Sequence, residues 1–264
     1  QPAWLLLRCG GAKKIPPGIC AGQDLSIFVS QKSGKIFKSP TCIKSTKKPT
    51  MLTVKSFTFN PVQENTYVVY NEKGECCIID PGSYFPGERD ELKTGIEKTG
   101  LTPVLLLNTH CHFDHVFGNL FVNETWGLIP HIHPLEAQVL DFAESSARGW
   151  QLPFDNYKGP TVYLETGKFI NIGDDRLEIR FTPGHSPGSL SFYSEESGFI
   201  IGGDVLFNGS VGRTDLPGGD MATLVQSIQT QFFTLPDETK VYSGHGPVTT
   251  VGFEKMNNPF VKVY

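Results

Sequence analysis

The feature that most constrains this chain is a run of three histidines and an aspartate within residues 109–115, THCHFDH. The run directly follows residues 104–107, VLLL, which have the length and composition of a buried β-strand. If the chain stays extended, His110, His112 and Asp114 point to one side, because side chains alternate along a strand. Imidazoles and a carboxylate gathered at a strand end are costly to take out of water without a cation among them. The run therefore predicts a metal site.

Three more candidate ligands occur in similar settings, each just past an apolar segment and beside glycine. They are His185 in PGHSPG, Asp204 in GGD and His245 in GHGP. Glycine lets the backbone turn sharply and approach a crowded centre. Imidazole and carboxylate together suit Zn²⁺, Fe or Mn²⁺ rather than Ca²⁺. His131 and His133 are interpreted instead as surface or turn histidines.

The order of the remaining patterns predicts an α+β fold with two sheets and outer helices. Alternating segments predict strands at residues 52–59, 66–70, 76–79, 176–181, 189–193 and 199–201. Apolar residues with helical spacing predict helices at residues 88–99, after Pro134 and after Asp220. Pro134 suits the first turn of a helix, and Asp220 has a side chain typical of an N-cap. We therefore expect strand-rich and helical segments in both halves of the chain.

Composition limits the classes of function. The 264 residues allow one large domain or two small ones, and 39% hydrophobic with 19% charged residues is typical of a soluble globular protein. No apolar run approaches the roughly 20 residues that span a bilayer, so no membrane partner is expected. A net charge of −4 makes a nucleic-acid partner unexpected.

Residues 1–50 differ from the rest, because they carry nine Lys or Arg and a single acid, Asp24. They lack sustained periodicity, and we predict a poorly ordered basic leader: a transit peptide, a translated upstream segment or an added one. The folded domain is then expected to occupy residues 51–264. The expected location is the cytoplasm, or an organelle if the leader is a transit peptide.

The spacing of the six cysteines does not suggest a disulfide framework and includes no CxxC pair, which favours free thiols in a reducing compartment. Pairing among Cys9, Cys20 and Cys42 remains an alternative. Cys111 alternates with the histidines around it, so packing is its expected role.

The motif HxHxDH, matched by His110, His112, Asp114 and His115, resembles that of the metallo-β-lactamase superfamily. The later residues His185, Asp204 and His245 match in order, and the resemblance covers residues 51–264. It implies a four-layer αβ/βα sandwich with the metals at one edge of the two sheets. It also implies that His110, His112 and His185 hold one metal and that Asp114, His115 and His245 hold a second, with Asp204 bridging.

Within the superfamily, residues 209–215 (GSVGRTD), 244–250 (GHGPVTT) and 258–260 (NPF) are similar to glyoxalase II-like hydrolases. The residue at position 204 is an aspartate and not a cysteine, which argues against a true β-lactamase. Classical hydroxyacylglutathione hydrolases carry a C-terminal helical domain, whereas nineteen residues follow His245 here. The resemblance is therefore to the compact enzymes, and the thiol carrier of the substrate is left open.

The resemblance implies a thioester hydrolase with two divalent metal ions, Zn²⁺ in the first place and Fe or Mn²⁺ as alternatives. A hydroxide shared by the two ions would attack a small-molecule thioester, with Asp114 orienting the water. Arg213 is the candidate for gripping a substrate carboxylate, although it could equally pair with Asp215. The oligomeric state is not predicted.

Two other functions remain open. Residues 109–112 and 212–215 also resemble motifs of the mononuclear iron persulfide dioxygenases, which use a subset of the same ligands. A metal-holding or redox-sensing module without catalysis is the second.

Overall fold

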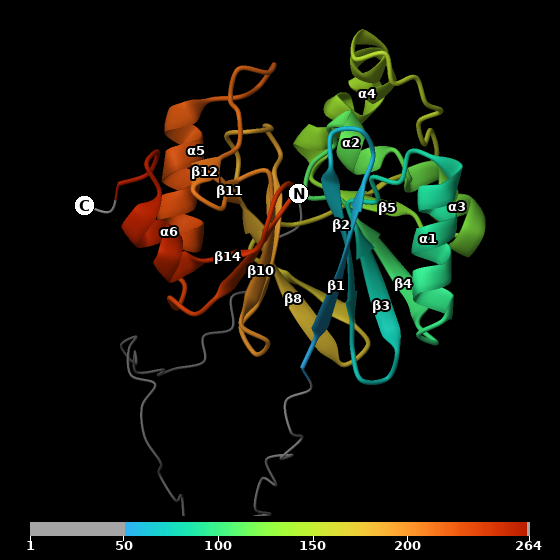
Figure 1. Ribbon diagram of the computed structural model, residues 1–264, viewed down its shortest axis with the longest axis horizontal. Helices are drawn as coiled ribbons and strands as arrows, with labels where there is room; N and C mark the ends of the chain where they lie inside the picture. Colours follow the sequence, from blue (N-terminus) through green and yellow to red (C-terminus); the bar gives the residue numbers. More distant parts are fainter. Residues whose placement is uncertain (1–50, 263–264) are drawn as a thin grey trace, which may run out of the picture. The chain divides into compact units, whose positions relative to one another are not determined.

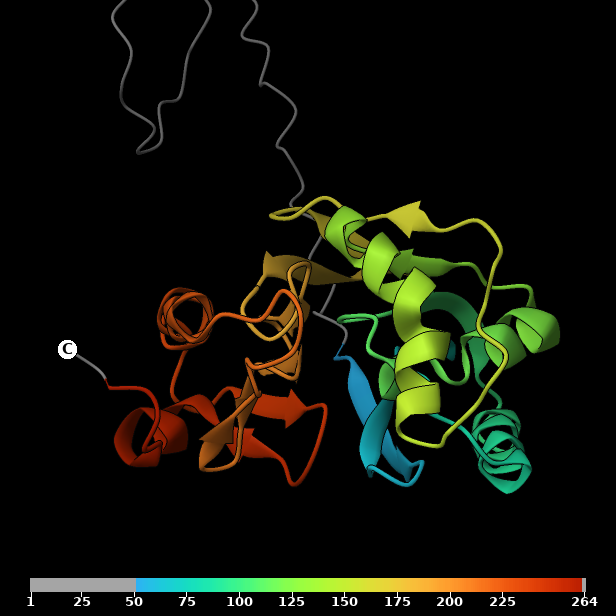
Figure 2. The same ribbon diagram turned by 90° about the horizontal axis from the view of Figure 1, so that it is seen from above.

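The computed structural model describes residues 51–262, so the prediction for residues 1–50 lies outside the described part. Two six-stranded mixed sheets lie face to face, and helices cover their outer faces (Figures 1 and 2). This arrangement confirms the predicted four-layer αβ/βα sandwich. Within residues 51–262, no helix has the length and apolar character needed to cross a membrane.

The first sheet has the strand order β1-β2-β3-β4-β5-β6. Its first three strands are antiparallel, and β3 to β6 run parallel. The strands are β1 (Thr53–Phe59), β2 (Glu64–Tyr70), β3 (Glu75–Ile79), β4 (Thr102–Leu107), β5 (Pro130–Ile132) and β6 (Val162–Tyr163). The helices on this side are α1 (Pro86–Glu97), α2 (Phe113–Val116), α3 (Asn119–Trp126), the short 3₁₀ helix η1 (Pro134–Glu136) and α4 (Ala137–Gly149).

The second sheet has the order β14-β13-β10-β9-β8-β7, in which only β10 and β13 are parallel neighbours. Its strands are β7 (Phe169–Ile172), β8 (Asp175–Phe181), β9 (Leu190–Ser194), β10 (Phe199–Gly203), β13 (Lys240–Ser243) and β14 (Thr249–Thr250). The hairpin β11 (Leu206–Phe207) and β12 (Ser210–Val211) follows β10. The outer helices are α5 (Met221–Ser227), η2 (Ile228–Phe232) and α6 (Val251–Asn257).

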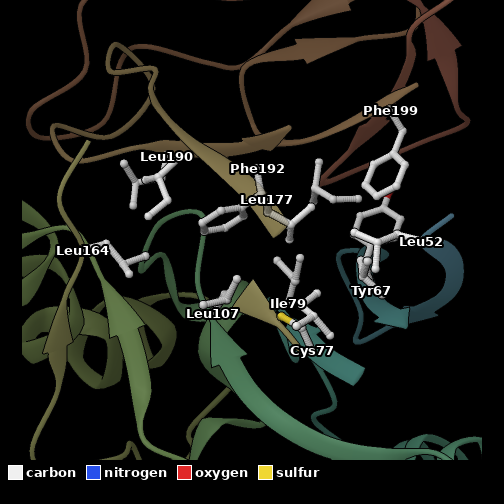
Figure 3. Packing of buried hydrophobic residues seen from close by; sticks show 14 residues of the cluster. Leu52, Tyr67, Cys77, Ile79, Leu107, Leu164, Leu177, Leu190, Phe192 and Phe199 are labelled. Carbon is white, nitrogen blue, oxygen red and sulfur yellow. The ribbon is translucent and has the colours of Figure 1, made fainter. Parts of the chain in front are cut away.

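Alternation along the strands supplies both faces of each sheet with apolar side chains. Ile79 and Leu107 of the first sheet meet Leu177 and Phe192 of the second in the layer between the sheets (Figure 3). On the outer face of the first sheet, the neighbouring residue Ile78 packs in a separate cluster with residues of α1 and α3. The central strand β3 therefore serves two cores, which is why its residues 76–79 are all apolar.

The helix predicted after Asp220 begins where expected but changes its winding. The Asp220 carboxylate accepts a hydrogen bond from the Thr223 N–H at 2.7 Å, as an N-cap does. From Ile228 the turn becomes π-helical, and the Phe233 N–H donates to the Ile228 carbonyl at 2.9 Å. The wider turn keeps Ile228 and Phe232 buried in one cluster with Leu224. With regular α-winding, the later side chains would rotate gradually away from this cluster.

Candidate metal centre

All seven candidate ligands converge at loops that follow strands of both sheets. His110 and His112 come just after β4, and Asp114 and His115 lie in α2. The second sheet supplies the others from the segments after β8, β10 and β13, namely His185, Asp204 and His245. The two sheets therefore meet at one polar cluster, as predicted.

His110, His112 and His185 form a first group, whose ring nitrogens lie within 4.8 Å of one another. The closest approach is 2.9 Å, between His112 Nδ1 and His185 Nε2. Three imidazole nitrogens converging on one point can occupy three positions of a tetrahedral metal ion.

Asp114, His115 and His245 form a second group of the same size. His245 Nε2 lies 3.2 Å from Asp114 Oδ2, and His115 Nε2 lies 3.7 Å from the same oxygen. One carboxylate and two imidazoles again suit a transition-metal ion.

Asp204 lies between the two groups. Its Oδ2 is 3.5 Å from His185 Nε2 of the first group, and its Oδ1 is 3.4 Å from His115 Nε2 of the second. Because Oδ2 also lies 3.7 Å from His245 Nε2 of the second group, the single carboxylate reaches both groups, which is the position expected of a bridge.

Several buried polar atoms in this cluster lack a hydrogen-bond partner within the described residues. They are His110 Nε2, His115 Nε2 and Asp204 Oδ1. A buried polar atom without a partner is destabilising, and such atoms are rare in native proteins. These three are half of the six such atoms in the described residues, and nitrogen with oxygen donors suits divalent transition metals, so the residues present fit one or two such ions.

The protein holds the opposite side of two of the rings. His115 Nδ1 donates to Asp80 Oδ2 at 3.1 Å, and Asp80 Oδ1 accepts from the Thr109 N–H at 2.7 Å. His185 Nδ1 donates to the Arg213 carbonyl at 2.7 Å. These bonds fix the tautomer, so that Nε2 of both rings faces the centre.

The electrostatic environment differs between the groups. Burial lowers the pKa of His110 well below its usual value, and burial together with His185 lowers the pKa of His112 to about 4. Burial also opposes the charging of His115, but the Asp114 and Asp204 carboxylates outweigh it and raise the pKa of that ring. His110 and His112 are therefore kept neutral, whereas the second group is an anionic environment that favours a cation.

Two glycines are required beside the candidate ligands. Gly184, next to His185, has φ +130°, and a Cβ there would overlap the backbone of Leu224. A Cβ on Gly244, next to His245, would overlap Asp204 Oδ1 and the His115 ring. The predicted role of glycine in letting the backbone approach the centre holds at both positions.

One part of the prediction was wrong: Asp114 does not continue an extended chain. His112 has extended backbone angles (φ −62°, ψ 150°), and α2 begins at the next residue. The helical turn directs Asp114 and His115 together into the second group, instead of aligning Asp114 with His110 and His112. Period-two reasoning could not detect this short helix.

Two supporting acids were missed from the sequence. Asp80 follows strand β3 directly, as Asp204 follows β10, so its place after an apolar strand could have identified it. Glu136 is fully buried and gave no such signal. Its carboxylate accepts from the Cys111 N–H at 2.8 Å, from Ser186 Oγ at 2.6 Å and from the Gly188 N–H at 2.7 Å. It therefore ties the loop of His110 and His112 to the loop of His185.

The remaining sequence candidates lie as follows. Arg213 lines the pocket at the centre, and its guanidinium donates to both oxygens of Asp215 at 2.7 Å. Among residues 51–262, His131 and His133 belong to no metal-capable group. Cys111 is free and buried in an apolar cluster with Val116, as expected.

The pocket beside the centre has a volume of about 630 Å³. His112, Asp114, His185, Asp204 and His245 form its polar floor. This volume lies within the range of small-molecule sites.

Comparison with known proteins agrees with this geometry. The family model described as the metallo-beta-lactamase superfamily matches residues 59–245. The protein named "Probable metallo-hydrolase YqgX" from Bacillus subtilis is 42% identical over 202 residues, which are 76% of this chain and 93% of that protein. "Hydroxyacylglutathione hydrolase GloC" from Haemophilus influenzae is 34% identical over 75% of this chain and 93% of its own length.

Solved structures give the same result. "BLEG-1 B3 metallo-beta-lactamase" is 39% identical, with a TM-score of 0.74 over 80% of this chain and 100% of that one. "TTHA1623 in a di-iron-bound form" is 40% identical, with a TM-score of 0.72 over 79% of this chain and 100% of that one. With seven candidate ligands gathered at the edge of an αβ/βα sandwich, the chain belongs to the metallo-β-lactamase superfamily.

Proposed function

We propose that this protein is a metal-dependent hydrolase that cleaves a small-molecule thioester, in the manner of glyoxalase II. The observation that carries the proposal is the place of Asp204, whose two oxygens reach both ligand groups beside an open pocket. The relative named hydroxyacylglutathione hydrolase supports the thioester class.

The two groups and Asp204 would hold a pair of divalent ions. Zn²⁺ is our first choice, and Fe or Mn²⁺ are alternatives, since one similar structure is of a di-iron-bound form. Ions bound here would lower the pKa of coordinated water towards about 7 and would stabilise negative charge on a carbonyl oxygen. The protein's own part is to keep His110 and His112 neutral and to fix the rings of His115 and His185.

Asp114 is the proposed catalytic carboxylate, because it lines the pocket and contacts His245. It would accept a hydrogen bond from the attacking water and so orient it. The pocket walls within the described residues contain no Tyr, Cys, Lys or Glu that could donate a proton to the leaving group. A thiolate has a pKa near 8.5 and leaves without such help, which favours a thioester over an amide or an alkyl ester.

Arg213 is the proposed contact for a polar group of the substrate. Its guanidinium stands at the pocket wall but is already engaged by Asp215, so it would offer only its remaining N–H groups. We therefore assign it a part in binding and none in the bond-breaking step. The buried free thiols Cys76, Cys77 and Cys111 favour a reducing compartment, and we propose the cytoplasm.

The test is an assay of purified protein with its metal content determined. We expect two divalent ions per chain and hydrolysis of S-lactoylglutathione or a simpler thioester. His112→Ala should abolish the activity, whereas the matched variant His133→Ala, outside the centre, should retain it. Two ions with no thioester cleaved would contradict the proposal.

The same preparation separates the other candidates. Oxygen consumption with glutathione persulfide and one iron per chain would identify a persulfide dioxygenase. Cleavage of a β-lactam would identify a β-lactamase, the activity for which one similar structure is named. Bound metal without activity on any of these substrates would identify a metal-holding module.

A further inference from the structure

A second pocket, of about 470 Å³, adjoins the pocket of the metal centre. The two share His112, Phe113, Ser145, Ser146 and Pro217 in their walls. The second pocket therefore lies within reach of a molecule whose reacting carbonyl is at the centre and whose acyl group extends past His112.

The walls of the second pocket are largely apolar, with His112, Gln138, Ser145 and Ser146 as their polar members. Leu135, Val139 and Phe142 line one side from η1 and α4, and Pro187 and Pro217 line the other. No Lys, Arg, Asp or Glu of residues 51–262 lines it. Leu135 and Phe142 are 53% and 57% exposed, although burial of large apolar side chains is favourable. An apolar occupant would remove both side chains from water.

The charges around the metal pocket point the same way. Arg213 is the one Lys or Arg among the described residues that line it, and that guanidinium is paired with Asp215. Away from the ions proposed for the centre, the two carboxylates of glutathione would find little positive charge in these walls. An uncharged carrier and an apolar acyl group fit both pockets better.

We propose that the second pocket is a subsite for an uncharged, apolar acyl group, so that the preferred substrates are thioesters of medium-chain or aromatic acids. This inference rests on the thioester hydrolase function proposed above. A cavity of about 150 Å³ suffices for benzene, so the second pocket has room for a chain of several carbons or a ring.

The experiment uses the metal-loaded protein and acyl thioesters of N-acetylcysteamine, an uncharged thiol, with acyl chains of two to eight carbons. The value of kcat/KM should rise with each methylene, by up to about fourfold where the group is fully buried. S-lactoylglutathione should be a poorer substrate than the octanoyl thioester.

Phe142→Asp places a charge in the second pocket on a largely exposed position of α4. It should lower kcat/KM for the octanoyl thioester by at least about tenfold, because burial of the additional methylenes of that chain raises kcat/KM by more than this factor. The value of kcat/KM for the acetyl thioester should be nearly unchanged. The matched control is Phe253→Asp, an exposed phenylalanine of α6 that lines neither pocket. It should behave as the wild type with every chain length.

Two results would overturn the inference: no dependence on chain length, or an equal effect of Phe142→Asp on all chains. If no thioester is cleaved, the proposed function fails, and binding of the uncleavable ketomethylene analogues then tests the subsite by itself. Tighter binding of the octanoyl than of the acetyl analogue, lost in Phe142→Asp, would support the subsite. Equal binding of the two analogues would refute it.

Discussion

The carboxylate of Glu136 accepts a hydrogen bond from the backbone N–H of Cys111 at 2.8 Å, beneath the metal centre. The same carboxylate holds Ser186 and Gly188, which follow His185. Three donors thus converge on one buried acid that is not itself a proposed ligand. The buried carboxylate therefore fixes the two loops that carry the first ligand group relative to each other.

Glu136→Gln should destabilise the protein by about 1–3 kcal/mol, because the amide turns an N–H towards one of the buried donors and leaves it without an acceptor. Chemical denaturation of the metal-free protein measures this change. Glu124→Gln, on the exposed side of α3, should leave the free energy of unfolding unchanged. A stable Glu136→Gln variant would show that the carboxylate is dispensable.

Asp80→Asn should weaken metal binding about 10- to 100-fold, the usual effect of losing the partner that orients a histidine ligand. Its carboxylate holds His115 Nδ1 and the Thr109 N–H, and an amide cannot accept from both with equal geometry. Competition with a chromophoric chelator gives the affinity. Asp90→Asn, exposed on α1, is the control and should match the wild type.

Gly244→Ala should reduce the metal content and the activity, because the added methyl group overlaps Asp204 Oδ1 and the His115 ring. Gly87→Ala in α1 meets no atom within 4 Å and should have no such effect. Elemental analysis of the two purified variants gives the comparison. Full metal content in Gly244→Ala would mean that Asp204 is not needed in its present position.

Removal of the metals with a chelator should lower the melting temperature, since an ion that binds only the folded chain stabilises it. At a free metal concentration of one hundred times Kd the effect is about 2.7 kcal/mol for each site. Differential scanning fluorimetry with and without chelator measures the shift. The shift should be smaller in His112→Ala, which removes one proposed ligand; an unchanged shift would exclude that residue.

Asp220 gives a pH dependence that is independent of the metals. Its hydrogen bond with Thr223 holds the pKa of the carboxyl below the ordinary value of 3.8. Because the folded-state pKa is the lower one, the stabilisation is present above the ordinary value and is lost as the pH falls through the folded-state pKa. Asp220→Ala should therefore be less stable than the wild type at pH 7. The difference, followed by thermal unfolding, should vanish in strong acid.

The sequence predicted the layers, half of the fourteen strands in the described residues and the convergence of seven distant residues, since alternation and strand-end position are local signals. It failed where the deciding contact is tertiary. Glu136 acts through backbone groups of two distant loops, which no spacing pattern records. The helical turn at Asp114 is only four residues long, too short for a periodicity to be visible. The π-helical turn at Ile228 depends on packing against the second sheet.

Each ligand group takes two residues from the segment after β4 and one from the second sheet, and Asp204 also comes from the second sheet. An ion held in either group would thus act as a cross-link between the two layers. A substitution that shifts one layer against the other, such as one at Phe192 in the interior, would therefore change metal affinity without touching a ligand. Metal affinity in this protein is in that sense a measure of how well the two halves of the sandwich fit together.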